Sequence, residues 1–83
     1  MKTVYKKILP QYFQDVLTGL KGFELRKDED DIQVDDVICL IEVDYYDGVL
    51  DVTGRFVEKI VKYVLRDVPQ YGLMKGYCII GFF

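Results

Sequence analysis

Hydrophobic and polar positions along the chain follow two periods, which divide it into predicted strands and one predicted helix. Pro10 stands at a favourable first helical position, and Phe13, Val16 and Leu17 follow at helical spacing. This pattern predicts a short helix that ends at Gly19, where a helix C-terminal glycine belongs. Stretches that are rich in β-branched and aromatic residues, or that alternate with period two, predict strands. The predicted strands are 3–9 (TVYKKIL), 23–27 (FELRK), 37–44 (VICLIEVD) and 77–83 (YCIIGFF).

Polar and turn-forming segments separate these elements. The acidic segment 27–36 (KDEDDIQVDD) and the segment 69–76 (PQYGLMKG) both predict loops. The turn-rich segment 45–54 contains Asp47-Gly48, a pair that favours a tight hairpin turn.

The segment 55–68 (RFVEKIVKYVLRDV) carries conflicting signals. Its periodicity predicts a helix, whereas its content of valine, isoleucine and aromatic residues favours a strand. The apolar stripe that fits helical spacing comprises Phe56, Val57, Ile60, Val61, Val64, Leu65 and Val68.

Length and composition limit the class of protein. Eighty-three residues make one domain, spanning 1–83, and a hydrophobic content of 51% predicts a real core. The net charge of −3 argues against a protein that coats nucleic acid through bulk charge, although it leaves room for a local basic groove. No apolar run reaches transmembrane length, and the N-terminus lacks the apolar region of a signal peptide. We therefore expect a soluble, cytoplasmic protein.

Metal and disulfide chemistry are not indicated by the residue content. The chain has no histidine, and its two cysteines lie far apart, so no zinc site and no cofactor are expected. Cys39 and Cys78 both lie in apolar runs, where a reduced cysteine behaves as a small hydrophobe. The acidic segment 27–36 lacks the glycine and spacing of a helix–loop–helix calcium site, so it predicts a solvated loop.

The strongest chemical signal is the motif Gly19-x-Lys21-x-x-Glu24-x-Arg26. The glycine suits a sharp turn from helix to strand, and period-two alternation sends Glu24 and Arg26 to one face of that strand. Lys21, at the turn, can reach the same place. A carboxylate beside two cations suits a ligand that has both a phosphate and a base edge.

This motif resembles the signature of the ASCH domain, a member of the PUA-like superfamily of small β-barrels associated with RNA. The resemblance extends to residues 7–36, 53–55, 63–67 and 72–82. In these segments the chain is similar to a short phage-associated ASCH-like family of unknown function. It implies a mostly β, α+β barrel of five or six strands with one or two short helices, in a protein of phage or bacterial origin. It also implies that 55–67 is a long strand, and we adopt that interpretation over the helical one.

The resemblance further implies a function. In related domains the lysine, glutamate and arginine of the motif are proposed to contact RNA or a nucleotide, in a cleft between the first helix and the sheet. Carried over, these residues are Lys21, Glu24 and Arg26. The function expected from the resemblance is therefore binding of RNA or a nucleotide.

Two departures from the family pattern bear on this expectation. Relatives commonly have a glycine-aspartate pair before the central strand, where this chain has Asp35-Asp36, so we expect a strained or altered turn. Some ASCH-like proteins are amidohydrolases of acylated cytidines and use a threonine nucleophile where this chain has Glu24. They also use a later carboxylate that has no clear counterpart here. The alternative is a small amidohydrolase or ribonuclease in which Lys21 and Glu24 act as an acid–base pair.

Less specific interpretations stand beside these. The three motif side chains also fit a solvated strand face whose ion pairs contribute about 0–1 kcal/mol each, or a partly buried pair that fixes the turn. Arg55 and Lys75 in loops are further candidates for phosphate contacts, and Tyr45 is a candidate for base stacking. The hydrophobic C-terminal residues Phe82 and Phe83 also fit an accessory protein that binds a host protein.

Overall fold

Six strands, one α-helix and one short 3-10 helix make up the chain, and a computed structural model describes all residues 1–83. Their order is β1 (Thr3–Ile8), α1 (Pro10–Leu17), β2 (Phe23–Lys27), β3 (Val37–Tyr46), β4 (Val49–Ile60), β5 (Tyr63–Leu65), η1 (Pro69–Tyr71) and β6 (Tyr77–Gly81). The predicted mostly β composition, with its strand number and its helix, is confirmed. No helix is long and apolar enough to cross a membrane.

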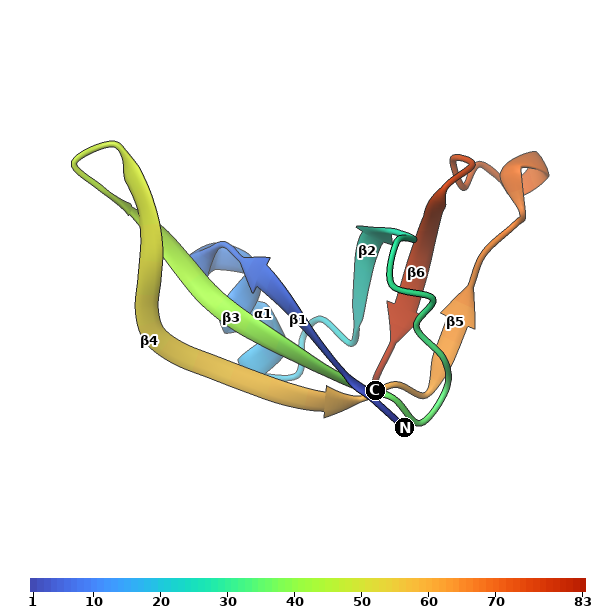
Figure 1. Ribbon diagram of the computed structural model, residues 1–83, viewed down its shortest axis with the longest axis horizontal. Helices are drawn as coiled ribbons and strands as arrows, with labels where there is room; N and C mark the ends of the chain where they lie inside the picture. Colours follow the sequence, from blue (N-terminus) through green and yellow to red (C-terminus); the bar gives the residue numbers. More distant parts are fainter.

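The strands form two three-stranded sheets rather than one closed hydrogen-bonded ladder. In the first sheet β3 lies between β1 and β4, and β1 runs parallel to β3. In the second sheet β6 lies between β2 and β5, and all pairs are antiparallel. Figure 1 shows the two sheets as the arms of an open V, with α1 on the inner side of the first sheet.

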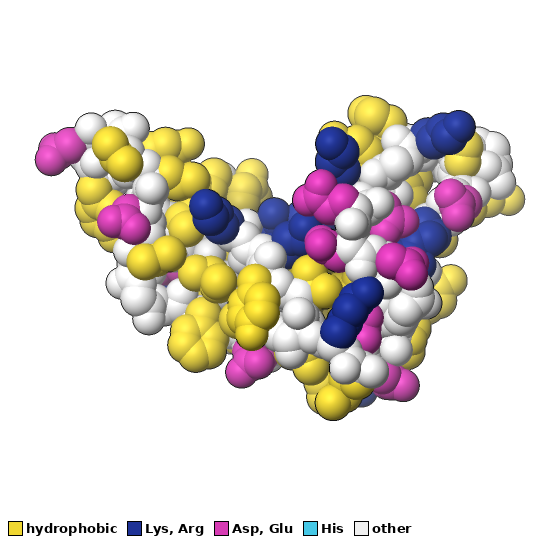
Figure 2. Space-filling model, viewed as in Figure 1, with side chains coloured by type: hydrophobic (Ala, Val, Ile, Leu, Met, Phe, Trp, Pro, Cys, Tyr) yellow, Lys and Arg dark blue, Asp and Glu magenta, His cyan; other side chains and the backbone are white.

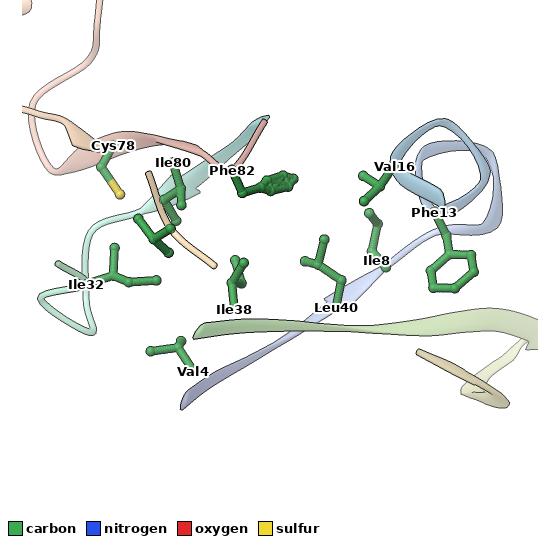
Figure 3. Close-up of a cluster of buried hydrophobic side chains, with 11 residues drawn as sticks. Val4, Ile8, Phe13, Val16, Ile32, Ile38, Leu40, Cys78, Ile80 and Phe82 are labelled. Atoms are coloured by element: carbon green, nitrogen blue, oxygen red, sulfur yellow. The ribbon is translucent and has the colours of Figure 1, made fainter. Parts of the chain in front are cut away.

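The hydrophobic core fills the space between the two sheets and α1 (Figure 3). Phe13 and Val16 of α1 point toward Ile8 and Leu40 of the first sheet, and residues of β6 approach from the other side. Each apolar side chain buried in this way stabilises the fold by about 1.5–3 kcal/mol. The core comprises Val4, Ile8, Phe13, Val16, Ile32, Ile38, Leu40, Val61, Cys78, Ile80 and Phe82. Cys78 and Cys39 are both buried and free, as predicted.

The helix predicted from periodicity over 55–68 is wrong. The segment contains the end of β4 and all of β5, separated at Val61 and Lys62. The expected strand is therefore present, but it is broken where the chain passes from one sheet to the other. Phe56 and Ile60 are 61% and 51% exposed on the outer face of the first sheet, and these exposed apolar residues completed the misleading helical stripe.

The predicted turns form where the sequence placed them. Gly19, with φ of 84°, lies in the left-handed region directly after the last turn of α1. Asp47 and Gly48 have φ of 51° and 79°, and positive φ at both positions is typical of a type I′ hairpin turn. This turn joins β3 to β4 in a long hairpin. β3 continues to Tyr46, two residues beyond its predicted end at Asp44.

The chain crossing at Val61 is held by the segment that precedes β3. The Val61 N–H donates to the Asp36 carbonyl at 2.8 Å, and the Asp35 N–H donates to the Val61 carbonyl at 2.9 Å. The Asp36 carboxylate accepts hydrogen bonds from the backbone N–H groups of Gln33 at 2.8 Å and Lys2 at 3.0 Å. These bonds, first that from Gln33, lower the pKa of Asp36 below its ordinary value. Asp35 has φ of 77°, so the turn is strained as expected.

Replacing Asp35 with glycine should therefore stabilise the protein. Glycine removes the left-handed strain but adds freedom to the unfolded chain, so we expect Asp35→Gly to raise the free energy of unfolding by about 0.5 kcal/mol. Val34→Gly is the matched control, because Val34 has no positive φ and its glycine variant should be destabilised. Urea denaturation measures both, and a loss of stability in Asp35→Gly would contradict the strain.

Candidate functional site

The end of α1 and the start of β2 position the three charged residues of the motif. After the left-handed Gly19, the Lys21 N–H donates to the Asp15 carbonyl at 3.0 Å, which folds the chain back toward the sheet. Alternation along β2 then turns Glu24 and Arg26 toward the inside of the V, as the motif predicts. The structure brings Lys21, Glu24 and Arg26 together.

Glu24 is the centre of this cluster, and its residue is only 3% exposed. Its Oε1 accepts a hydrogen bond from the Lys21 ammonium, and its Oε2 accepts one from the Arg26 Nε at 2.8 Å. A buried carboxylate is costly unless it is paired and hydrogen-bonded, and here both oxygens have a cationic partner. The side chains of Lys21 and Arg26 remain partly exposed at the surface above it.

Arg26 also connects the two sheets. Its Nη2 donates to the carbonyl oxygen of Lys7 in β1 at 2.7 Å. Both β1 and β2 are edge strands of their sheets, and no backbone ladder joins them. The Arg26 side chain thus links β1 to β2, whereas in a closed barrel backbone hydrogen bonds would pair the two strands.

A cleft of about 520 Å³ lies along this gap, between the end of β1, the start of α1 and β2. Lys7, Lys21 and Arg26 line it against a single carboxylate, that of Glu24. Two aromatic rings lie near the Lys21 ammonium, whose Nζ is 5.0 Å from the centroid of the Tyr12 ring and 5.5 Å from that of the Phe23 ring. Figure 2 shows Lys and Arg side chains at the base of the hollow between the two arms of the V. The cleft therefore combines positive charge with apolar rings.

Arg55 lies elsewhere in the molecule. It stands in β4 beside Gly54, where the register between β3 and β4 is interrupted, and its guanidinium binds both oxygens of the buried Glu42 at 2.9 Å. The same guanidinium covers the Phe13 ring at 4.8 Å. The hydrogen bonds from Arg55 and then from Thr53 lower the pKa of Glu42. Arg55 is thus engaged in holding the bent β3–β4 hairpin and does not line the cleft.

Tyr45 and Lys75 do not join the cluster either. Tyr45 lies near the tip of the β3–β4 hairpin, and Lys75 lies in the loop between η1 and β6. These two segments form opposite ends of the long axis of the molecule in Figure 1.

The acidic segment binds cations of the chain itself. Asp28 pairs with Arg66 at 2.7 Å, and Asp30 pairs with Lys6 at 2.6 Å. The hydrogen bond with Asp28 raises the pKa of Arg66, and that with Asp30 raises the pKa of Lys6. These side chains attach the loop to β1 and to the end of β5.

Sequence reasoning missed Lys7, Tyr12 and Phe23 as cleft residues. Strand alternation puts Phe23 on the opposite face of β2 from Glu24, but because β2 is an edge strand, side chains of that face also border the cleft. Tyr12 follows Pro10 on the exposed side of α1, and only the docking of α1 beside β2 brings its ring to Lys21.

A comparison with protein families matches nearly the whole chain to one family model. Residues 5–82 match the model of a domain of unknown function, DUF3850. The chain belongs to the DUF3850 family. The match includes every residue that lines the cleft of this DUF3850 domain. No curated protein matches the chain.

The buried carboxylate of Glu24 should matter for stability. Its removal leaves Lys21 and Arg26 without their partner, and we expect Glu24→Ala to lower the free energy of unfolding by about 2 kcal/mol. This value is below the roughly 3–5 kcal/mol of a fully buried pair because both cations are partly exposed to water. Glu58→Ala, at an exposed strand position, is the control and should change stability by less than about 0.5 kcal/mol. Equal stability of the two variants in urea denaturation would contradict a structural role for Glu24.

The Glu42–Arg55 pair should make the stability of the fold depend on pH in the acid range. Because the pKa of Glu42 is lower in the folded protein than its ordinary value of 4.5, its contribution is present above about that pH. The contribution is lost as the pH falls through the lower folded pKa. Wild type should therefore exceed Glu42→Gln in stability at neutral pH, and the difference should shrink below pH 4.5. A difference that stays constant from pH 7 to pH 3 in thermal denaturation would show that the pair does not titrate in this way.

Proposed function

We propose that this DUF3850 domain is a non-catalytic module that binds RNA or a nucleotide in the cleft beside Lys21, Glu24 and Arg26. The observation that carries the proposal is the convergence of these side chains on the wall of an open cleft, next to two aromatic rings.

The cations suit a phosphate group. The Lys21 ammonium has three N–H donors and gives one to Glu24, while Arg26 uses Nε and Nη2 within the protein and keeps the donors of Nη1. Hydrogen bonds between such cations and phosphate oxygens are among the strongest in proteins. Glu24 holds both cations in place before the ligand arrives, which lowers the entropy cost of binding.

The rest of the cleft suits a nucleobase. Its volume lies within the range of small-molecule sites, about 300–1,000 Å³. The rings of Tyr12 and Phe23 offer apolar surface for a planar base, and base–aromatic stacking tolerates any base. Since the chain as a whole carries a charge of −3, affinity must come from this local group of cations and should fall steeply with salt.

The resemblance of the motif to that of ASCH domains supports the same proposal. On this view the two sheets are an open PUA-like barrel, and the cleft is the place where β1 and β2 would otherwise close it. The proposed setting is the cytoplasm, in a protein of phage or bacterial origin. A host-protein partner is a further proposal, based only on the exposed C-terminal Phe83.

The acid–base alternative is less well supported by the geometry. In this alternative Lys21 is the base and Glu24 the acid or orienting group. Lys21 instead donates a hydrogen bond to Glu24, and both oxygens of Glu24 accept hydrogen bonds from Lys21 and Arg26 beneath the surface. We therefore expect no product when the protein is incubated with acylated cytidines or single-stranded RNA. Turnover that disappears in both Lys21→Ala and Glu24→Gln would favour the hydrolase instead.

The binding proposal is tested by titrating the protein with cytidine and adenosine 5′-monophosphates at low salt and following backbone amide NMR signals. We expect saturable shifts at residues 21–26 and at Tyr12, and a loss of affinity of about tenfold or more in Lys21→Ala, which removes a charge-assisted hydrogen bond. Lys75→Ala, an equal loss of charge far from the cleft, should bind as wild type does. Absence of saturable binding in wild type, or equal loss in both variants, would overturn the proposal.

A further inference from the structure

An exposed row of aromatic rings crosses the outer face of the second sheet. Phe23 of β2 and Tyr63 of β5 both pair with Gly81 of the central strand, so they flank a position that has no side chain. The ring of Phe83 fills that position, because a Cβ added to Gly81 would lie 3.0 Å from the Phe83 Cε1. Phe23, Phe83 and Tyr63 are 48%, 84% and 58% exposed. We call this row the aromatic platform.

The aromatic platform is continuous with the cleft. One hollow, of about 470 Å³, covers the platform, and Phe23 borders both this hollow and the cleft. A second hollow has a volume of about 280 Å³. It shares Gly22 and Phe83 with the first hollow and Lys21 with the cleft. The three concave surfaces thus meet around residues 21–23.

The charges beside the aromatic platform are positive. Lys21 and Lys59 line the smaller hollow, and no aspartate or glutamate side chain borders either hollow. Between the cleft and the platform, Lys21 and Lys59 can therefore bind phosphates. The rings of the platform can stack bases. This is the combination by which proteins hold single strands without reading their sequence.

We infer that the aromatic platform stacks the bases of a single-stranded nucleic acid whose phosphates follow Lys21 and Lys59 out of the cleft. This inference rests on the proposed function and specifies its ligand as an oligonucleotide rather than a mononucleotide. A second copy of the chain is the other plausible occupant of an apolar sheet face. In a two-fold dimer, however, the patch would meet itself and bring the same flanking lysines toward each other.

The test compares a fluorescein-labelled single-stranded RNA octamer with a mononucleotide, at low salt. Tyr63→Leu and Phe83→Leu each remove one stacking ring and keep an apolar side chain. We expect each to weaken octamer binding by at least about fivefold, with mononucleotide binding in the cleft unchanged. Tyr46→Leu is the matched control, since Tyr46 is an equally exposed tyrosine on the β3–β4 hairpin, and it should bind the octamer as wild type does.

A second variant reports stacking directly. The chain contains no tryptophan, so Phe83→Trp introduces a single fluorescent indole into the aromatic platform. The octamer should quench its emission, whereas an abasic octamer of the same length should not. Quenching by both would show that phosphates alone approach the indole, and it would overturn the stacking.

The outcomes separate the two proposals. Octamer binding that is lost in Lys21→Ala but unchanged in Tyr63→Leu and Phe83→Leu overturns the platform and leaves the cleft function standing. Octamer binding that is lost in the platform variants and in Lys21→Ala, with no mononucleotide binding to the wild type, overturns nucleotide binding in the cleft and leaves the platform standing. A dimer in sedimentation velocity that Phe83→Leu dissociates would assign the platform to self-association and overturn the inference.

Discussion

The buried carboxylate of Glu24 fixes the part of the molecule where the two sheets are not joined by backbone hydrogen bonds. It orients Arg26, and Arg26 in turn reaches the Lys7 carbonyl on the edge of β1. Because this link is a side chain and not a strand, the edges of β1 and β2 stay apart and leave a cleft between them. The residues that link the two sheets at this place, Glu24 and Arg26, thus also line the candidate site.

Similar ion pairs connect distant segments at other places in this small domain. The Glu42–Arg55 pair holds the bend of the β3–β4 hairpin, and Asp28–Arg66 attaches the acidic segment to the end of β5. A domain of 83 residues buries a limited apolar surface, so such contacts between distant segments are a reasonable supplement. These pairs leave the net charge of −3 unchanged, because each one uses one cation and one anion. The charge is unevenly distributed all the same, because Lys7, Lys21 and Arg26 line the cleft with one carboxylate, that of Glu24.

The parts that sequence reasoning predicted correctly depend on local rules. The end of α1 at Gly19 and the turn at Asp47-Gly48 follow from backbone freedom, and the convergence of Glu24 and Arg26 follows from strand alternation. The break at Val61 depends on backbone bonds to residues about 25 positions earlier, which no local pattern contains. For the same reason Tyr12 was missed as a cleft residue, and the distant positions of Tyr45, Arg55 and Lys75 were not foreseen.

The structural role and the proposed binding role of the motif are compatible because its two cations are held differently. Arg26 is bound by two acceptors, a carboxylate and a backbone carbonyl, so it belongs to the wall of the cleft. Lys21 has one acceptor, a flexible four-carbon stem and two aromatic rings beside its ammonium. In the proposed function, a phosphate binds the ammonium donors that Lys21 does not give to Glu24, while Arg26 keeps the second oxygen of Glu24 paired. Lys21 is therefore the group that we expect to contact a ligand directly. Arg26 is the group that links β1 to β2 and keeps the cleft at its width.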